Sequence, residues 1–70
     1  MGNHKEAIGL LTKALKMAPG NDLILLTLGV CYAEEGNFPV SLEIMKKAVN
    51  LFPNNQRIRN NYEGIKKAAR

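Results

Sequence analysis

Apolar residues recur at helical spacing along four stretches of the chain. In the second stretch, between Asp22 and Glu35, they are too frequent for a helix with a single apolar face. At about 100° per residue they divide into three stripes, so this helix needs cover on several sides. The stripes are Leu25, Leu28, Gly29 and Tyr32; Ile24, Leu28, Cys31 and Glu35; and Leu23, Leu26, Val30 and Ala33.

Polar and helix-breaking residues mark where the helices begin and end. Asp22 supplies a carboxylate that can cap free N–H groups, and Gly36 with Asn37 ends the same helix because both tolerate positive φ. Pro39 suits the first turn of a third helix, which Pro53 stops. The pattern therefore predicts four antiparallel neighbouring helices, over about residues 4 to 18, 22 to 35, 39 to 52 and 55 to 69.

An internal repeat organises these helices. Residues 2 to 21 match residues 36 to 55 at an offset of 34, with identities at Gly2/Gly36, Asn3/Asn37, Lys13/Lys47, Ala14/Ala48, Pro19/Pro53 and Asn21/Asn55. A period of this length is typical of helical solenoids. After Asn55 the match is lost, but the apolar stripe of Ile58, Tyr62, Ile65 and Ala69 remains, which is typical of a terminal capping helix.

The repeat resembles the tetratricopeptide repeat, whose pattern is W-x2-L-G-x2-Y, A-x3-F and P over thirty-four residues. Here the pattern reads Leu25-x2-Leu28-Gly29-x2-Tyr32, then Ser41-x3-Met45, then Pro53. Leu, Ser and Met replace the Trp, the Ala and the aromatic residue. The small Gly29 should let the paired helices approach closely.

This resemblance implies a fold and a domain organisation. We expect an all-α fold of four antiparallel helices in a tetratricopeptide-like α-α superhelix, forming one domain over residues 1–70. Within it, residues 1–21 would be the second half of a repeat, 22–55 a complete repeat and 56–70 a capping helix. The chain would then be a fragment of a longer array, or a small domain with a shifted repeat frame.

Charge and composition restrict the function classes. The net charge of +4 lies wholly in residues 50 to 70, because residues 1 to 49 hold five basic and five acidic side chains. The single cysteine allows no internal disulfide, and no segment resembles a signal peptide. The longest apolar-rich run, Leu23 to Ala33, is too short to span a bilayer. These features predict a cytoplasmic domain with no membrane partner.

Catalytic chemistry has few candidate residues in this chain. There is one His, one Cys and one Asp, and no Gly-rich phosphate loop. His4 matches Phe38 in the repeat, so we interpret it as a partly packed residue at a helix start; with Glu6 it would lack further metal ligands. Cys31 lies on an apolar stripe, as expected for a buried thiol. The sequence predicts no enzyme, no cofactor, no metal and no small-molecule substrate.

The third stripe of the central helix is the informative feature. Two stripes suffice to pack this helix between its neighbours, and leftover apolar surface usually marks an interaction site. In the resembled family the first helix of each repeat lines a concave groove. The implied partner-binding positions are Leu23, Leu26, Thr27, Val30, Ala33 and Glu34, with Arg57, Asn60, Asn61 and Lys67 on the last helix.

The expected partner is a protein or peptide with aliphatic anchors and an acidic group or a C-terminal carboxylate. Two alternatives remain open. Ile8, Leu11 and Leu15 lack the helix that a full repeat would pair with them, which favours self-association into a homo-oligomer. Nucleic-acid binding is the weaker alternative, because Tyr62 is assigned to the core and cannot stack on bases. It would use Arg57, Arg59, Lys66, Lys67 and Arg70.

Overall fold

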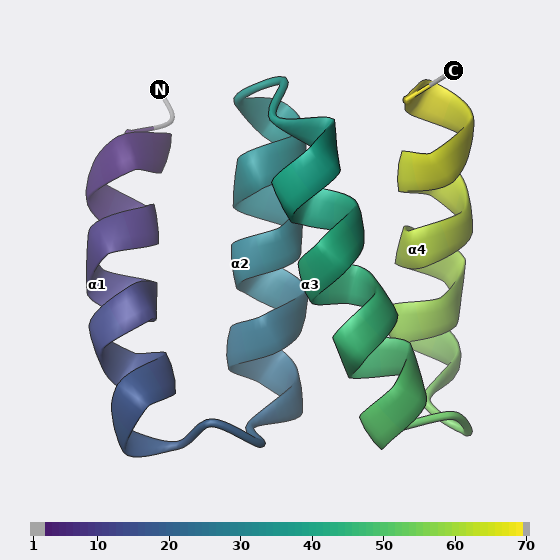
Figure 1. Ribbon diagram of the computed structural model, residues 1–70, viewed down its shortest axis with the longest axis horizontal. Coiled ribbons are helices and arrows are strands. Elements are labelled where there is room, and N and C mark those ends of the chain that lie inside the picture. Colours follow the sequence, from purple (N-terminus) through teal and green to yellow (C-terminus); the bar gives the residue numbers. More distant parts are fainter. Residues whose placement is uncertain (1–2, 70) are drawn as a thin grey trace.

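The computed structural model describes residues 3–69, and these form four helices joined by short links. The helices are α1 His4–Met17, α2 Asp22–Glu34, α3 Phe38–Leu51 and α4 Gln56–Ala68. They run alternately in opposite directions, so both ends of the chain lie at the same end of the molecule (Figure 1). The predicted all-α arrangement of four antiparallel helices is confirmed, and each helix end lies within one residue of its predicted position.

An asparagine precedes each helix and caps it. The side-chain oxygen of this residue accepts a hydrogen bond from the backbone N–H three residues further on, which is the usual capping geometry. The four caps are Asn3, Asn21, Asn37 and Asn55. The Asp22 carboxylate also takes up a free N–H group at the start of α2, as expected: its Oδ1 accepts from the N–H of Leu23 at 2.9 Å, although the N-cap residue itself is Asn21.

The link between α2 and α3 turns at Gly36. This residue has a φ of 81°, and it is the only one of the described residues with positive φ. The N–H of Gly36 donates to the carbonyl of Ala33 at 2.9 Å, and the N–H of Asn37 donates to the carbonyl of Tyr32 at 2.9 Å. These two bonds form a Schellman motif, which glycine favours because it carries no Cβ.

The other two links, between α1 and α2 and between α3 and α4, form the same kind of turn, and each contains a proline. The N–H of Asn21 donates to the carbonyl of Ala18 at 3.1 Å, and the N–H of Asn55 donates to the carbonyl of Phe52 at 3.1 Å. Pro19 and Pro53 occupy the second position of these turns, where their fixed φ is favourable. The prolines that the offset of 34 aligns in the sequence therefore make the same turn in the structure.

The central helix α2 contacts all three other helices, whereas α1 contacts α2 alone. The main core lies where α2, α3 and α4 meet. Its buried members are Leu25, Leu26, Met45, Ala48, Ile58 and Ile65. The three neighbouring helices therefore cover α2 on several sides, as its sequence predicts.

The closest approach of α2 and α3 is at Gly29. A Cβ added there would contact the Met45 side chain, with its Cγ only 2.8 Å away. The buried hydroxyl of Ser41 donates to the carbonyl oxygen of Gly29 at 2.6 Å. The expectation that a small residue at this position brings the paired helices together is confirmed, and Ser41 adds a hydrogen bond that an alanine would lack.

Candidate functional site

The sides of α2 and α4 that face each other leave two hollows between them. We call the larger one, of about 420 Å³, the upper hollow, because it lies where α2 and α4 end at the top of Figure 1. Its walls combine apolar side chains with one carboxylate and two amides. They are Val30, Ala33, Glu34, Phe38, Asn60, Asn61, Gly64, Ile65 and Ala68.

The second hollow, of about 300 Å³, lies at the opposite ends of the same two helices. We call it the lower hollow. Its walls are Asp22, Leu23, Leu26, Asn55, Arg57 and Ile58. It carries one charge of each sign, and the Asp22 carboxylate also accepts a hydrogen bond from Asn55 at 3.4 Å. The basic character expected at this end of the groove is therefore partly offset.

Most of the residues predicted to bind a partner lie in the two hollows. Five of them line the upper hollow: Val30, Ala33, Glu34, Asn60 and Asn61. Leu23, Leu26 and Arg57 line the lower one. Thr27 and Lys67 line neither hollow, and the Thr27 hydroxyl donates to the carbonyl of Leu23 at 2.8 Å.

Leu26 differs from the expectation of leftover apolar surface. Only 8% of this residue is exposed, and it belongs to the main core. The cause is α4, which packs directly on α2 and covers the middle of the third stripe. Leu23 on the same stripe stays 62% exposed. Leu26 therefore supports the floor of the lower hollow and does not present a free contact surface.

Gly64 and Ala68 line the upper hollow but were not among the predicted residues. They stand 34 positions after Val30 and Glu34, in the part of the chain where the residue match at this offset is lost. They carry little side-chain chemistry, and for this reason sequence reasoning passed over them. Their small size is what leaves the hollow open, since nothing lies within 4 Å of a Cβ placed on Gly64.

The two amides on the α4 side are held by local hydrogen bonds. The side-chain nitrogen of Asn61 donates to the carbonyl of Arg57 at 2.8 Å, and the side-chain oxygen of Asn60 accepts from Gln56 at 2.9 Å. Each amide keeps one polar atom without a hydrogen bond to the rest of the described chain: the nitrogen of Asn60 and the oxygen of Asn61. Together they offer one donor and one acceptor beside the hollow.

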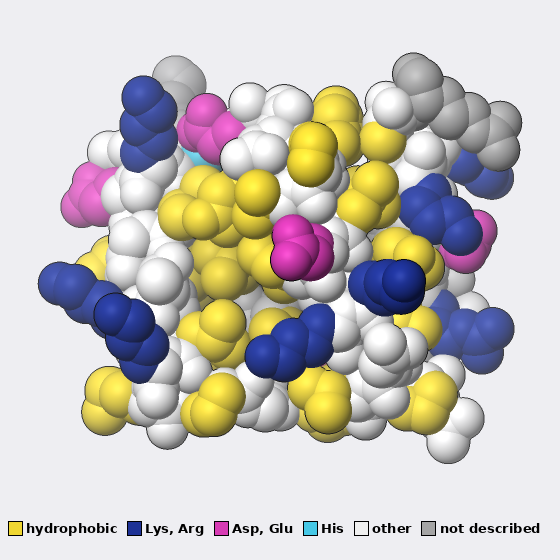
Figure 2. Space-filling view, in the orientation of Figure 1, with side chains coloured by type: hydrophobic (Ala, Val, Ile, Leu, Met, Phe, Trp, Pro, Cys, Tyr) yellow, Lys and Arg dark blue, Asp and Glu magenta, His cyan; other side chains and the backbone are white. Residues whose placement is uncertain are grey.

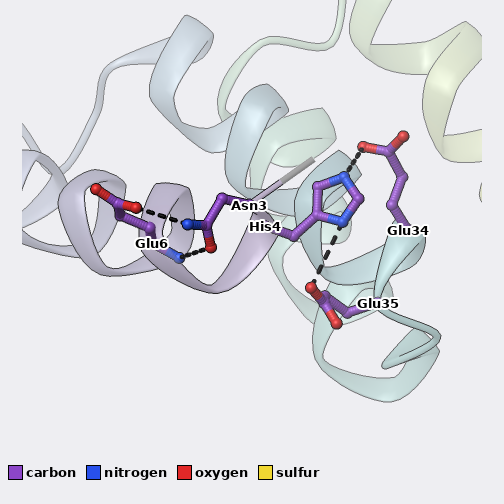
Figure 3. A network of polar contacts seen from close by, with 5 residues as sticks. All are labelled: Asn3, His4, Glu6, Glu34 and Glu35. Carbon is purple, nitrogen blue, oxygen red and sulfur yellow. Dashed lines mark hydrogen bonds and ion pairs between the residues drawn. The ribbon is translucent and has the colours of Figure 1, made fainter. Parts of the chain in front are cut away.

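His4 joins the start of α1 to the end of α2. Its Nε2 lies 3.3 Å from Glu34 Oε1, and its Nδ1 lies 3.5 Å from Glu35 Oε1 (Figure 3). The two carboxylates lie on opposite ring nitrogens, so they cannot share one metal ion with the imidazole. Nearby, Asn3 and Glu6 exchange two contacts at the start of α1. The interpretation of His4 as a partly packed residue at a helix start agrees with this arrangement.

Cys31 is buried, as the sequence predicts. Burial raises the pKa of its thiol, and the negative charges of Glu34 and Glu35 raise it further. A thiol with a raised pKa is mostly protonated near neutral pH, which disfavours nucleophilic chemistry. Between residues 3 and 69 no three His, Cys, Asp or Glu side chains are grouped so that they could hold a metal ion.

The surface on the α3 side has a different character. Figure 2 shows Lys and Arg side chains spread over α1, α3 and α4 on this face rather than gathered on α4. A third hollow, of about 280 Å³, lies between α1 and α3 and is lined by Leu15, Leu25, Val40, Glu43, Ile44 and Lys47. On this face the positive charges are spread out (Figure 2), and Glu43 lies among the residues of the third hollow.

A family model described as tetratricopeptide repeat matches residues 1–60 of the sequence. The chain belongs to the tetratricopeptide repeat family. Tetratricopeptide repeat domains generally mediate protein–protein interaction, and these repeats are typically non-catalytic. No curated protein and no solved structure gives a significant match. Over the range the structure describes, no helix has both the length and the apolar character needed to cross a membrane.

Proposed function

We propose that this tetratricopeptide repeat chain is a non-catalytic adaptor that binds a peptide segment of a partner protein in the groove between α2 and α4. The upper hollow carries the proposal. It is larger than the lower hollow and the hollow between α1 and α3, and it combines an apolar floor with two amides at its edge. Peptide-binding sites commonly pair an apolar pocket for a side chain with polar groups for the main chain.

An aliphatic side chain of the peptide would enter the upper hollow and contact Val30, Phe38 and Ile65. Each buried methylene group adds about 0.8 kcal/mol. The amide nitrogen of Asn60 would then donate to a peptide carbonyl, and the amide oxygen of Asn61 would accept from a peptide N–H. This pairing would fix the orientation of the bound peptide, because the donor and the acceptor are one residue apart on α4.

The lower hollow would hold a second part of the same segment. The exposed side chain of Leu23 offers apolar contact there, and Arg57 offers a cation to an acidic group. Asp22 in the same hollow weakens the attraction for strongly acidic peptides. We therefore propose that the aliphatic anchor contributes more to affinity than the acidic group.

The proposed function assigns roles to the parts of the chain. Residues 22–55 form the complete repeat, and residues 56–70 form a capping helix whose inner face completes the groove. Residues 1–21 act as the second half of a preceding repeat. Two observations support this division. The sequence matches itself at an offset of 34 residues, and α2 and α4 begin where the second and third parts begin.

The test blocks the upper hollow without touching the core. Gly64→Gln would place a side chain in the hollow, and nothing lies within 4 Å of its Cβ position. Gly9→Gln on α1 is the matched control, because Gly9 is also an exposed helical glycine with open space at its Cβ position. Peptides are first selected from a random display library with the wild-type chain. Their affinities for the three chains are then measured by fluorescence anisotropy.

We expect Gly64→Gln to weaken the selected peptides at least about tenfold, since it removes roughly two buried methylene groups of contact. Gly9→Gln should bind like the wild type. Equal affinity for all three chains would reject the upper hollow as the site. Selection of no peptide, together with salt-sensitive binding of single-stranded nucleic acid, would favour the nucleic-acid alternative instead.

A further inference from the structure

The outer side of α1 carries the two most exposed large apolar side chains among the described residues, Leu10 and Met17. Helices α2, α3 and α4 each contain buried residues, whereas α1 contains none. Two of its large apolar side chains are strongly exposed: Leu10 at 63% and Met17 at 89%. A helix with this much uncovered apolar surface is suited to a further partner.

These two residues belong to one stripe. Glu6, Leu10, Lys13 and Met17 follow each other at spacings of four, three and four, which is the seam of a heptad pattern. The opposite side of α1 carries the half-buried residues that pack toward α2, and among them Leu15 contacts the main core. The stripe therefore faces away from the rest of the molecule.

The charges on the stripe decide how it can pair with itself. Leu10 lies near the middle, with Glu6 one turn before it and Lys13 one turn after it. In an antiparallel pair centred on Leu10, Glu6 of each copy lies opposite Lys13 of the other. In a parallel pair, equal charges would face each other. The helix dipoles also favour the antiparallel arrangement.

We propose that a second copy of this chain covers the stripe, forming an antiparallel two-fold dimer through α1. Leu10 meets Leu10 of the second copy at the centre, and two Glu6–Lys13 pairs flank it. An isologous contact of this kind closes on itself, so it yields dimers and not filaments. One pair of helices, each about 21 Å long, buries less than the roughly 1,600 Å² of a standard interface. The dimer therefore depends on protein concentration.

This dimer does not depend on the proposed function, and it leaves the groove open. None of the residues that line the upper or the lower hollow belongs to α1. A dimer would thus carry two accessible grooves, and a partner with two peptide segments would gain affinity through effective concentration.

Sedimentation velocity over a dilution series tests the proposal with charge reversal. Lys13→Glu and Glu6→Lys each place equal charges opposite each other, and each should weaken the dimer at least about tenfold. Mixing the two variants restores opposite charges at both pairs, so the mixture should dimerise where neither variant does alone. Lys16→Glu is the matched control: it makes the same charge change on the same helix, about 90° away from the stripe.

Circular dichroism of each variant verifies that the helices are intact. Leu10→Gln is a second test of the dimer that leaves every charge in place. Leu10→Gln should also shift the protein toward the monomer. A wild-type chain that is monomeric at every concentration would overturn the proposal. So would a mixture that dimerises no better than the single variants, or a Lys16→Glu variant that weakens the dimer as much as Lys13→Glu does.

Discussion

Helices α1 and α3 begin in the same way and differ in what covers them. Both follow an asparagine cap, and the offset of 34 aligns Leu11 with Met45 and Ala14 with Ala48. Yet α3 buries Met45 and Ala48 completely, while α1 buries no residue. The difference arises because α3 packs against both α2 and α4, whereas α1 packs against α2 alone.

Local helix formation and burial by neighbouring helices contribute separately to the fold. Capping, helix propensity and apolar spacing act within a few residues, and they produce a helix at both places. Burial depends on neighbouring helices, and it decides how much each helix contributes to the free energy of unfolding. Substitutions at aligned positions in α1 and α3 should therefore have unequal effects.

The largest difference is expected between Met45→Ala and Leu11→Ala. The Met45 residue has no exposed surface, so truncation should cost about 2–5 kcal/mol of unfolding free energy through lost burial and a cavity. Leu11 is half-buried and should lose less than half as much. Urea denaturation followed by circular dichroism measures both values. Equal losses would mean that α1 is covered as fully as α3.

A smaller difference is expected between two glycines. Gly29→Leu should destabilise the fold by about 1–3 kcal/mol, because the new side chain collides with Met45 across the α2–α3 contact. Gly9→Leu on α1 meets nothing within 4 Å and should stabilise the helix by up to about 1 kcal/mol. Thermal unfolding curves compare the two variants. An unchanged melting temperature for Gly29→Leu would show that the helices do not approach at this glycine.

The hydrogen bond of Ser41 should have a measurable but modest effect. Ser41→Ala removes the 2.6 Å bond to the carbonyl of Gly29 and should cost about 0.5–1.5 kcal/mol. The aligned position on α1 is Ala7, and Ala7→Ser should change stability by no more than about 0.5 kcal/mol. Chemical denaturation of the two variants side by side decides the matter. No loss in Ser41→Ala would mean that the bond adds nothing to the α2–α3 contact.

The smallest effect concerns how often α1 separates from α2. Cys31 is buried and lies on the same stripe of α2 as Glu35, which pairs with His4, so we expect this thiol on the side of α2 that α1 covers. Because its pKa is raised above the ordinary 9.0, labelling by a thiol reagent should be slower in the folded chain than in urea at every pH up to that value. If α1 opens locally, Leu11→Ala should speed this labelling more than Met45→Ala does when the two variants are compared at the same free energy of unfolding.

The sequence predicts the helices well because their signals are local. Apolar spacing, prolines and the offset of 34 are readable without any knowledge of contacts, and the helix ends fall within one residue of their predicted positions. The N-cap residue of α2, Asn21, was not named among the predicted capping residues. Asn21 repeats Asn55 and Asp22 does not repeat, so the internal repeat already contained the correct signal.

The candidate site could be predicted only in part. Val30 and Ala33 follow from the leftover stripe, and Asn60 and Asn61 follow from the resemblance to the tetratricopeptide repeat. The burial of Leu26 could not, because it depends on how closely α4 packs on α2. The size of a hollow depends on the small residues in its wall as much as on the large side chains around it. For this reason Gly64 has no sequence signal of its own.

Binding in the groove between α2 and α4 can be followed residue by residue in a chemical-shift titration. The ¹⁵N-labelled wild-type chain is titrated with the tightest peptide from the library selection. The groove predicts the largest shifts at Val30, Ala33, Asn61 and Gly64, and saturation at a peptide concentration at least about tenfold higher in the Gly64→Gln variant. Shifts confined to α1, or to Arg59 and Lys66 on the outer side of α4, would contradict it and assign binding to another surface of the molecule.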